Sequence, residues 1–353
     1  MSTLLQSSAA HPILVTGATG FLGAHIVSQL LHAGHHVRAT VRSPSSIPKL
    51  RTTLAQPASP TSPLTIAIVP DLTAPGAFTA AAEGVVGIIH SASPFVLKVE
   101  SIENDLLKPA INGTLEILEA AAATPTCARV VIISSFAAAL NLEAGSRPGY
   151  TYTSADWNPS TYETARTGDA LNGYGASKTL AEKAGWDFVA ERKPHFELVT
   201  TCPAWIFGPR LDEIEDLGRL NESTGAIYRL INGTLKEVPG TDFGAWVDVR
   251  NIAKASIQGL VRPGVGGKRY LVTGGKWNYQ DAVDAILEEF PELEGRVPVG
   301  KPGSGKDEID LWYKVDSSPA QKELGIDWID LKKSIVDMVR TLLDNEKRLG
   351  VTH

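Results

Sequence analysis

Two short stretches of the chain carry side chains that together could reduce a carbonyl group. Tyr174 and Lys178 stand four positions apart, a spacing that puts both side chains on one face of a helix. Upstream, Ser134 and Ser135 directly follow a continuous apolar run. Because hydride addition builds negative charge on the carbonyl oxygen, a proton donor and a hydrogen-bond donor must stand beside that atom. Tyr174 is the predicted proton donor.

Lys178 would adapt this phenol to neutral pH. A free tyrosine has a pKa of about 10 and holds its proton strongly. A neighbouring ammonium and a cationic nicotinamide favour the phenolate and lower that pKa, and Lys178 can also hydrogen-bond the nicotinamide ribose. A serine hydroxyl would orient the carbonyl oxygen. Side chains alternate along a strand, so only one of Ser134 and Ser135 can face the site, and the pattern alone leaves both open.

A glycine-rich stretch at residues 16–23 predicts a dinucleotide site. It follows the first apolar run and opens the first helical pattern, the place where such a turn meets a pyrophosphate. Its glycines permit a tight turn, close approach of the phosphates and close helix packing. The alternative is a merely tight turn between strand and helix. The residues predicted to contact the cofactor here are Gly17, Thr19, Gly20, Phe21, Leu22 and Gly23.

The charges around the second predicted strand favour NADP(H) over NAD. An NAD site usually carries Asp or Glu near the end of that strand, yet the first acidic residue of this chain is Asp71. Arg42 stands there instead, with Lys49 seven positions later. Arginine can hold a 2′-phosphate through two parallel hydrogen bonds. Each of the two residues could also be a solvated surface charge.

Two further segments should border the cofactor, because each follows a predicted strand at the carboxyl edge of the sheet. Asp71 and Leu72 follow the third strand, where Asp71 could accept from the adenine amino group or cap the next helix. The fourth strand ends at His90, for which a structural hydrogen bond is favoured over an acid role. The cofactor contacts predicted after it are Ser91, Ala92 and Ser93.

Alternating strand and helix patterns predict an α/β fold, a Rossmann-type doubly wound parallel sheet with a smaller C-terminal substrate lobe. Helical patterns lie at about 21–33, 101–123 and 173–192, then at 212–232, 279–289 and 330–347. The cofactor domain is expected over 1–207 plus roughly 243–275, and the lobe over 208–242 plus 276–353. The predicted strands are residues 13–16, 36–41, 64–69, 86–90, 130–134, 198–202 and 270–273.

The composition of the chain indicates which binding partners and which cellular compartment are expected. The 353 residues carry a net charge of −6, which argues against nucleic acid. No apolar run approaches the roughly 20 residues of a membrane span, and the first residues lack the pattern of a secretory signal. Cys127 and Cys202, the two cysteines, have no metal-ligand or redox spacing, so a cytoplasmic protein with free thiols and no metal is expected.

Taken together, these motifs resemble the extended short-chain dehydrogenases/reductases, in particular the yeast-type NADPH-dependent methylglyoxal/carbonyl reductases and the plant dihydroflavonol and cinnamoyl-CoA reductases. The likeness extends over nearly the whole chain. Beyond the glycine-rich turn and the Tyr-x-x-x-Lys pair, the blocks that carry it are residues 90–95, 104–114, 134–136, 156–159, 203–209 and 247–251.

The resemblance implies roles that spacing alone does not assign. It identifies Ser135 as the catalytic serine and directs Arg42 and Lys49 to the 2′-phosphate. Asn112 matches a helix asparagine of relatives that serves a water relay or a structural role, and the structural role is favoured. Pro203, Trp205 and Ile206 should border the nicotinamide. The residues implied to line the substrate cavity are Phe95, Phe136, Leu140, Leu171 and Trp205, for each of which core packing is the alternative.

The function that follows is NADPH-dependent reduction of a small aldehyde or ketone to an alcohol, with Ser135, Tyr174 and Lys178 as catalytic groups. Alternatives are a dihydroflavonol or cinnamoyl-CoA type of reductase, a sugar epimerase or dehydratase, and an NADPH-sensing regulator. Phe136 and Arg42 speak against a sugar enzyme that uses NAD, and the intact Tyr/Lys pair speaks against a sensor. In this family the helices near 101–123 and 173–192 can form a homodimer, although some relatives are monomers.

Overall fold

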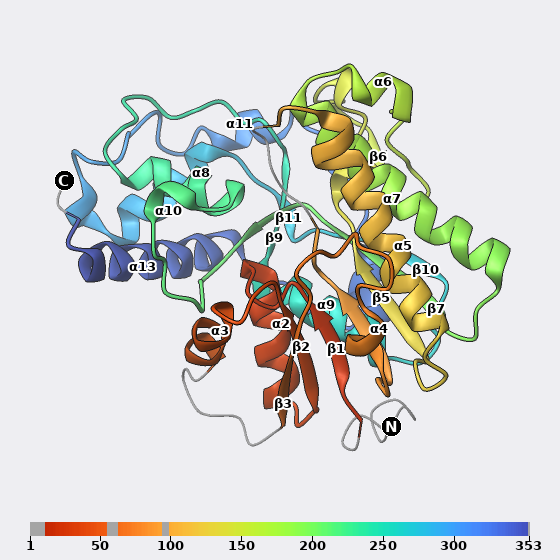
Figure 1. Ribbon diagram of the computed structural model, residues 1–353. Coiled ribbons are helices and arrows are strands. Elements are labelled where there is room, and N and C mark those ends of the chain that lie inside the picture. The colour runs from red at the N-terminus through yellow and green to blue at the C-terminus, as the bar shows by residue number, and fades with distance from the viewer. Residues whose placement is uncertain (1–10, 55–62, 94–98, 352–353) are drawn as a thin grey trace.

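Seven parallel strands form the centre of the protein, where the seven apolar runs predict them (Figure 1). The computed structural model describes residues 11–54, 63–93 and 99–351. The strand order is β10-β7-β5-β4-β1-β2-β3. The chain adds β2 and β3 on one side of β1 and then adds β4 and the later strands on the other side. The point between β1 and β4 where the order changes is where sheets of this kind bind their ligands. The strands are β1 (Ile13–Thr16), β2 (Val37–Val41), β3 (Leu64–Ile68), β4 (Gly87–His90), β5 (Arg129–Ile133), β7 (Glu197–Pro203) and β10 (Lys268–Val272).

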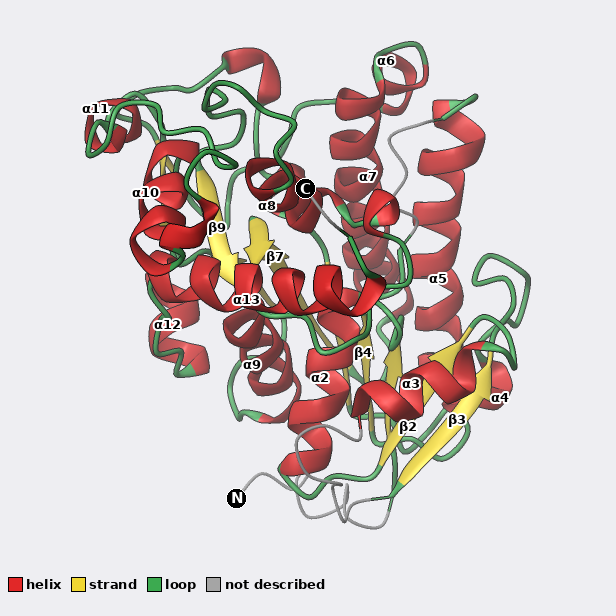
Figure 2. Ribbon diagram, turned by 90° about the vertical axis from the view of Figure 1, so that its left-hand side faces the viewer, coloured by secondary structure: helices red, strands yellow, loops and turns green. Residues whose placement is uncertain are grey.

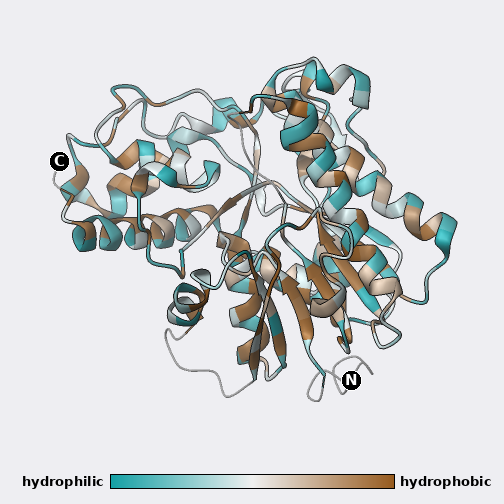
Figure 3. Cartoon of the chain, viewed as in Figure 1, coloured by the Kyte–Doolittle hydropathy of each residue, from teal (hydrophilic) through white to brown (hydrophobic). Residues whose placement is uncertain are grey.

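Helices cover both faces of this sheet, which explains why its strands are rich in buried apolar residues (Figure 3). One face packs on α2 (Phe21–His32), α9 (Val249–Val261) and α12 (Ser318–Leu324), with α3 (Ser46–Leu54) beside α2. The other face packs on α4 (Thr79–Ala82), α5 (Lys108–Ala122) and α7 (Ala170–Arg192), and a π-helical turn at Glu103–Leu107 precedes α5.

The second lobe lies beside the carboxyl edge of the main sheet and has a hydrophobic core of its own (Figures 1 and 2). Its three-stranded sheet consists of β8 (Trp205–Phe207), β9 (Ala245–Asp248) and β11 (Gly275–Lys276). Helices α8 (Glu222–Ile231), α10 (Tyr279–Glu289) and α13 (Leu331–Leu349) complete the core. Smaller elements are β6 (Thr151–Tyr152), which pairs with β12 (Lys314–Val315), and the short helices α6 (Tyr162–Arg166) and α11 (Gly305–Ile309).

The lobe departs from the sequence prediction in two places. The helix expected over 212–232 is confined to α8, because residues 209–221 form a loop with one short helical turn. Helix α12 falls within the predicted lobe, yet its Ala320 and Leu324 are buried in the same cluster as Ile252 of α9. A domain boundary at residue 276 therefore assigns α12 to the lobe, although α12 packs in the core of the main sheet. Among the described residues, no helix is both long and apolar enough to cross a membrane.

Candidate active site

A cleft of about 440 Å³ opens at the carboxyl edge of the main sheet and brings most of the predicted site residues together. It lies at the ends of β1, β4 and β5 and beside the first turns of α2 and α7. The predicted residues that line it are Gly17, Thr19, Gly20, Phe21, Leu22, Gly23, Arg42, Leu72, Ser91, Ala92, Ser93, Ser135, Tyr174, Lys178, Pro203 and Ile206. Those that do not are Lys49, Asp71, Asn112, Phe136, Leu140, Leu171 and Trp205.

The glycines of the first turn are required by close backbone contacts. Gly17 has a φ of +69°, and a Cβ there would lie 2.9 Å from the Ala92 nitrogen. A Cβ on Gly23 would lie 2.1 Å from the carbonyl oxygen of Gly17, so any side chain would push α2 away from the turn. With these glycines, the N-terminus of α2 faces the cleft and offers its free N–H groups to an anion.

Thr16 holds the turn that follows β4. Its hydroxyl oxygen accepts from the N–H groups of Ser91 and Ala92, each at 3.1 Å, and therefore donates its own proton to His90 Nδ1 at 2.9 Å. Burial lowers the pKa of His90 to about 3, and the charge of Lys178 adds to the effect. His90 is thus a neutral structural histidine, and Thr16 is a supporting residue that the motif search missed.

At the far end of the cleft, the three polar residues predicted for the adenosine side have different surroundings. Arg42 lines the cleft and is exposed. The Asp71 carboxylate accepts from the backbone and the hydroxyl of Thr73, at 2.8 and 2.7 Å, which lowers its pKa. Asp71 thus closes a local turn and does not cap the next helix, α4, which begins at Thr79. Lys49 pairs with Glu215 of the lobe at 3.0 Å.

The predicted reacting groups meet at the other end of the cleft. Asp169 caps α7 by accepting from the Asn172 N–H, which starts the helix one turn before Tyr174. The Tyr174 hydroxyl hydrogen-bonds the side chain of Ser135, the residue that begins the turn after β5. Lys178 lies one turn further along α7, with Nζ 5.7 Å from the centre of the Tyr174 ring. Serine, tyrosine and lysine therefore form one group at the mouth of the sheet.

Burial dominates the titration of this pair in the protein alone. It raises the pKa of Tyr174 to about 12, and the hydrogen bond with Ser135 acts in the opposite direction. Burial also lowers the pKa of Lys178 to about 8. The sequence analysis expects a lowered tyrosine pKa, and here the loss of hydration outweighs the nearby ammonium. The phenol is a protonated donor over the whole neutral range.

The two serines of the strand end have separate roles. Ser134 is buried, and its hydroxyl donates to Glu182 of α7 at 2.7 Å. Ser135 presents its hydroxyl to Tyr174. The pattern alone left both serines open, and both line the cleft. Because the Ser134 hydroxyl is engaged by Glu182, these contacts favour Ser135 as the one that faces a substrate.

None of the four described apolar residues that were predicted to line the substrate cavity lines the cleft. Phe136 and Leu140 are buried in a cluster with Tyr152 and Tyr313, so they pack the core behind Ser135, in line with their alternative role. Leu171 is 57% exposed at the start of α7, and Asn112 is exposed on α5. The Trp205 ring is partly buried, at 5.9 Å from the ring of Trp277. Phe95 lies outside the described residues.

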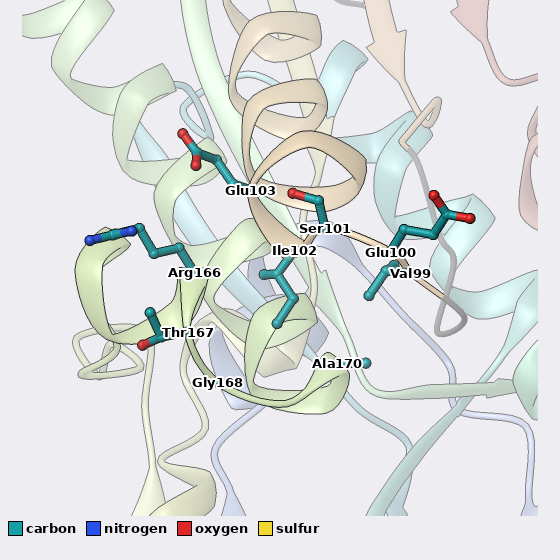
Figure 4. Close-up of a pocket in the computed structure, with 9 residues that line it drawn as sticks. All are labelled: Val99, Glu100, Ser101, Ile102, Glu103, Arg166, Thr167, Gly168 and Ala170. Carbon is teal, nitrogen blue, oxygen red and sulfur yellow. The ribbon is translucent and has the colours of Figure 1, made fainter.

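A second, more open hollow of about 830 Å³ lies between the segment 99–103 and the loop that joins α6 to α7 (Figure 4). Two of its charged side chains have partners within the chain. Glu103 accepts from the Tyr162 hydroxyl at 3.0 Å, and Arg166 pairs with Glu163. None of the predicted catalytic or cofactor residues lines it. No group of His, Cys, Asp and Glu suited to a metal ion occurs among the residues that the structure describes.

A doubly wound sheet with a glycine-rich turn, and with Ser, Tyr and Lys at its crevice, defines a dinucleotide-binding α/β protein. The chain belongs to the NAD dependent epimerase/dehydratase family, whose model matches residues 13–272.

Individual relatives cover almost the whole chain. The NADPH-dependent methylglyoxal reductase GRE2 of Saccharomyces cerevisiae is 32% identical over 96% of this chain and 99% of its own length. The cinnamoyl-CoA reductase CAD2 of Medicago truncatula is 33% identical over 97% and 98%. The crystal structure of yeast methylglyoxal/isovaleraldehyde reductase Gre2 complexed with NADPH superposes with a TM-score of 0.87, at 32% identity over 96% and 99% of the two chains.

Proposed function

We propose that this protein reduces an aldehyde or ketone to an alcohol with NADPH. The observation that carries the proposal is one cleft with a phosphate-binding turn in the middle, Arg42 at one end, and Tyr174 hydrogen-bonded to Ser135 at the other. The yeast relative Gre2, which is named for NADPH and for methylglyoxal reduction, matches this chain along nearly its full length in sequence and in structure and so supports the proposal.

The residues of the cleft fit a dinucleotide phosphate. The glycine turn leaves no room for a Cβ at Gly17 or Gly23, so backbone N–H groups can approach a pyrophosphate. Arg42 can hold a 2′-phosphate, whereas the Asp71 carboxylate is already engaged by Thr73. Lys49, in a surface ion pair with Glu215, is the weaker candidate for that phosphate.

The bound nicotinamide would supply the hydride, and the chain supplies the rest. Ser135 donates a hydrogen bond to the carbonyl oxygen and so fixes its direction. Tyr174 transfers its proton to the same oxygen as negative charge develops there. Lys178 stabilises the phenolate left behind, which solvent then reprotonates. The apolar cluster under Ser135, with Phe136 at its centre, keeps water from one side of the reacting atoms.

Initial rates with NADPH and NADH over a panel of α-dicarbonyls, aryl ketones, β-keto esters and cinnamoyl-CoA test the proposal. We expect NADPH oxidation with aldehydes or ketones and little with NADH. Turnover of the thioester alone would favour the second candidate, a cinnamoyl-CoA type of reductase, which the full-length similarity to CAD2 supports. NADPH binding without oxidation across the panel would contradict both.

The setting and assembly are proposals as well. Cys127 and Cys202 are free and buried, which fits a reducing compartment such as the cytoplasm. Helices α5 and α7, which pack side by side, are the surface through which a homodimer would form. Sedimentation of the purified protein distinguishes a dimer from a monomer.

A further inference from the structure

Behind the catalytic groups, Glu182 is the centre of a buried polar network that the reaction itself does not use. Its side chain has 0% exposure and pairs with Arg269 of β10, whose Nε lies 2.8 Å from Oε1. Two hydroxyls also donate to the carboxylate: Ser134 to Oε2 at 2.7 Å and Thr200 of β7 to Oε1 at 2.6 Å. A carboxylate this deeply buried needs such partners, and here it has them from three strands of the main sheet or their ends.

The position of Glu182 relates this network to catalysis. Tyr174, Lys178 and Glu182 recur every four residues on α7 and so share one face of the helix. Ser134 immediately precedes Ser135, so the donor to Glu182 and the partner of Tyr174 are neighbours in the chain. One face of α7 therefore contacts the end of β5 at two places. Glu182 meets Ser134 at the first, and Tyr174 meets Ser135 at the second.

We propose that Ser134 and Glu182 are positioning residues. Their hydrogen bond ties the end of β5, which carries Ser135, to the helix that carries Tyr174 and Lys178, and so fixes the distance between the two reacting hydroxyls. The inference rests on the proposed reduction, because only then does the contact between Ser135 and Tyr174 matter for a rate.

The surroundings favour a specific tie over general core packing. Gly175 brings α7 close to the turn after β5, since a Cβ there would lie 2.9 Å from Asn158 Nδ2. Asn158 in turn donates to the Ala137 carbonyl at 3.0 Å, which holds the turn beyond Ser135. On the other side of Ser135, the end of β5 is held to α7 by the hydrogen bond from the Ser134 hydroxyl to Glu182. Arg269 remains as charge partner when that hydroxyl is removed, so the fold should survive its loss.

The chain offers a matched control. Ser134→Ala and Thr200→Val each remove one hydroxyl donor to the same buried carboxylate, but the neighbours of Thr200 carry no reacting hydroxyl. We expect Ser134→Ala to lower kcat about tenfold or more, since small displacements of reacting groups cost rate steeply. Thr200→Val should leave kcat within about twofold, with a similar loss of Tm, because it removes the same kind of hydrogen bond. Both should bind NADPH, followed by its fluorescence, as the native protein does. Ser134→Thr, which keeps a hydroxyl, should restore most of the rate.

A double-mutant cycle separates positioning from structure. If Ser134 acts through Ser135, adding Ser134→Ala to Ser135→Ala should cost nothing further in kcat. An equal loss in both backgrounds, or a comparable loss of kcat in Thr200→Val, overturns the proposal. Should Ser134→Ala not fold, Ser134→Cys, with a weaker donor of similar size, takes its place.

Crystal structures with NADPH give a result that does not depend on turnover. The distance between the hydroxyl oxygens of Ser135 and Tyr174 should increase in Ser134→Ala and stay unchanged in Thr200→Val. An unchanged distance in both variants overturns the inference even if the native enzyme is active. A native enzyme inactive over the whole panel overturns the proposed function instead, and the distances still decide whether Ser134 positions Ser135.

Discussion

Lys178 Nζ donates a 2.7 Å hydrogen bond to Ser93 Oγ, which joins α7, the helix that carries the predicted Tyr/Lys pair, to the turn after β4. The two residues stand 85 positions apart in the chain, yet both line the cofactor cleft. The ammonium is held there at an energetic cost, because burial lowers the pKa of Lys178 from 10.5 to about 8. A charge kept in place against desolvation is typical of a functional site.

Replacing Lys178 should therefore stabilise the protein while it abolishes reduction. A fall in pKa from 10.5 to about 8 corresponds to about 3 kcal/mol of penalty on the charged form. After the lost bond to Ser93 is allowed for, we expect Lys178→Met to gain about 2 kcal/mol at pH 7. Thermal unfolding measures the gain, and NADPH oxidation measures the loss of turnover.

The sign of the pH dependence provides the control for this prediction. The folded pKa of Lys178 lies below its unfolded value, so the penalty is fully present below pH 8. It decreases as pH rises from about 8 to 10.5, because only the unfolded state then binds the proton. The advantage of Lys178→Met should accordingly shrink over this range. A gain that is constant with pH would contradict the assignment.

Tyr174→Phe should abolish reduction and leave NADPH binding nearly intact. The phenol lies beside Ser135, where only its hydroxyl is lost and the ring remains to pack. We expect a fall in kcat of at least about a hundredfold, the usual contribution of a general acid. Single-turnover rates together with a fluorescence titration of NADPH measure both quantities. A variant that keeps most of its turnover would remove Tyr174 from the mechanism.

The sequence predicts the main sheet far better than the lobe, and strand length explains the difference. Each strand of the main sheet has four residues or more and carries buried or partly buried apolar side chains, and helices cover the sheet on both faces. In the lobe, β11 has two residues and β8 three, too few for a periodic pattern to appear. Residues 212–221 were predicted to be helical but belong to the loop 209–221, which docks on the cofactor domain, where the Pro209 carbonyl accepts from His25 at 2.8 Å.

In the site, residues tied to a local motif were found and those that depend on tertiary packing were not. The glycine turn and the Tyr/Lys pair are set by short spacings, which the sequence displays directly. The roles of Thr16 and Glu182 depend on hydrogen bonds to residues that are distant in the sequence, so no local pattern predicts them. Phe136, which follows Ser135, was predicted to line the substrate cavity, whereas its ring is fully buried in the core.

Arg42→Ala should weaken NADPH at least tenfold and leave NADH almost unchanged, because only NADPH carries the 2′-phosphate that the guanidinium would bind. Arg42 is an exposed side chain at the rim of the cleft, so the change should not disturb the fold. Arg51→Ala is the matched control, since Arg51 is exposed on the adjacent helix α3 and does not line the cleft. Equal losses for the two cofactors in a binding titration would refute a phosphate contact.

Trp205→Ala should change the substrate preference or the stereochemical outcome more than it changes cofactor affinity. Trp205 lies on β8 between Ala204 and Ile206, both of which line the cleft, and its ring packs on Phe207 and Trp277 of the lobe. Trp205 does not itself line the cleft, so its removal should act through its two cleft-lining neighbours, which could then shift toward the lobe. Bulkier ketones should therefore gain relative to methylglyoxal by about tenfold in kcat/KM. Trp328→Ala removes a partly buried ring that packs on the core between α2 and α9, and it should lower stability without altering selectivity. Relative rates over the carbonyl panel and the enantiomeric excess of each alcohol measure the effect. An unchanged selectivity profile in Trp205→Ala would place this residue outside the substrate site.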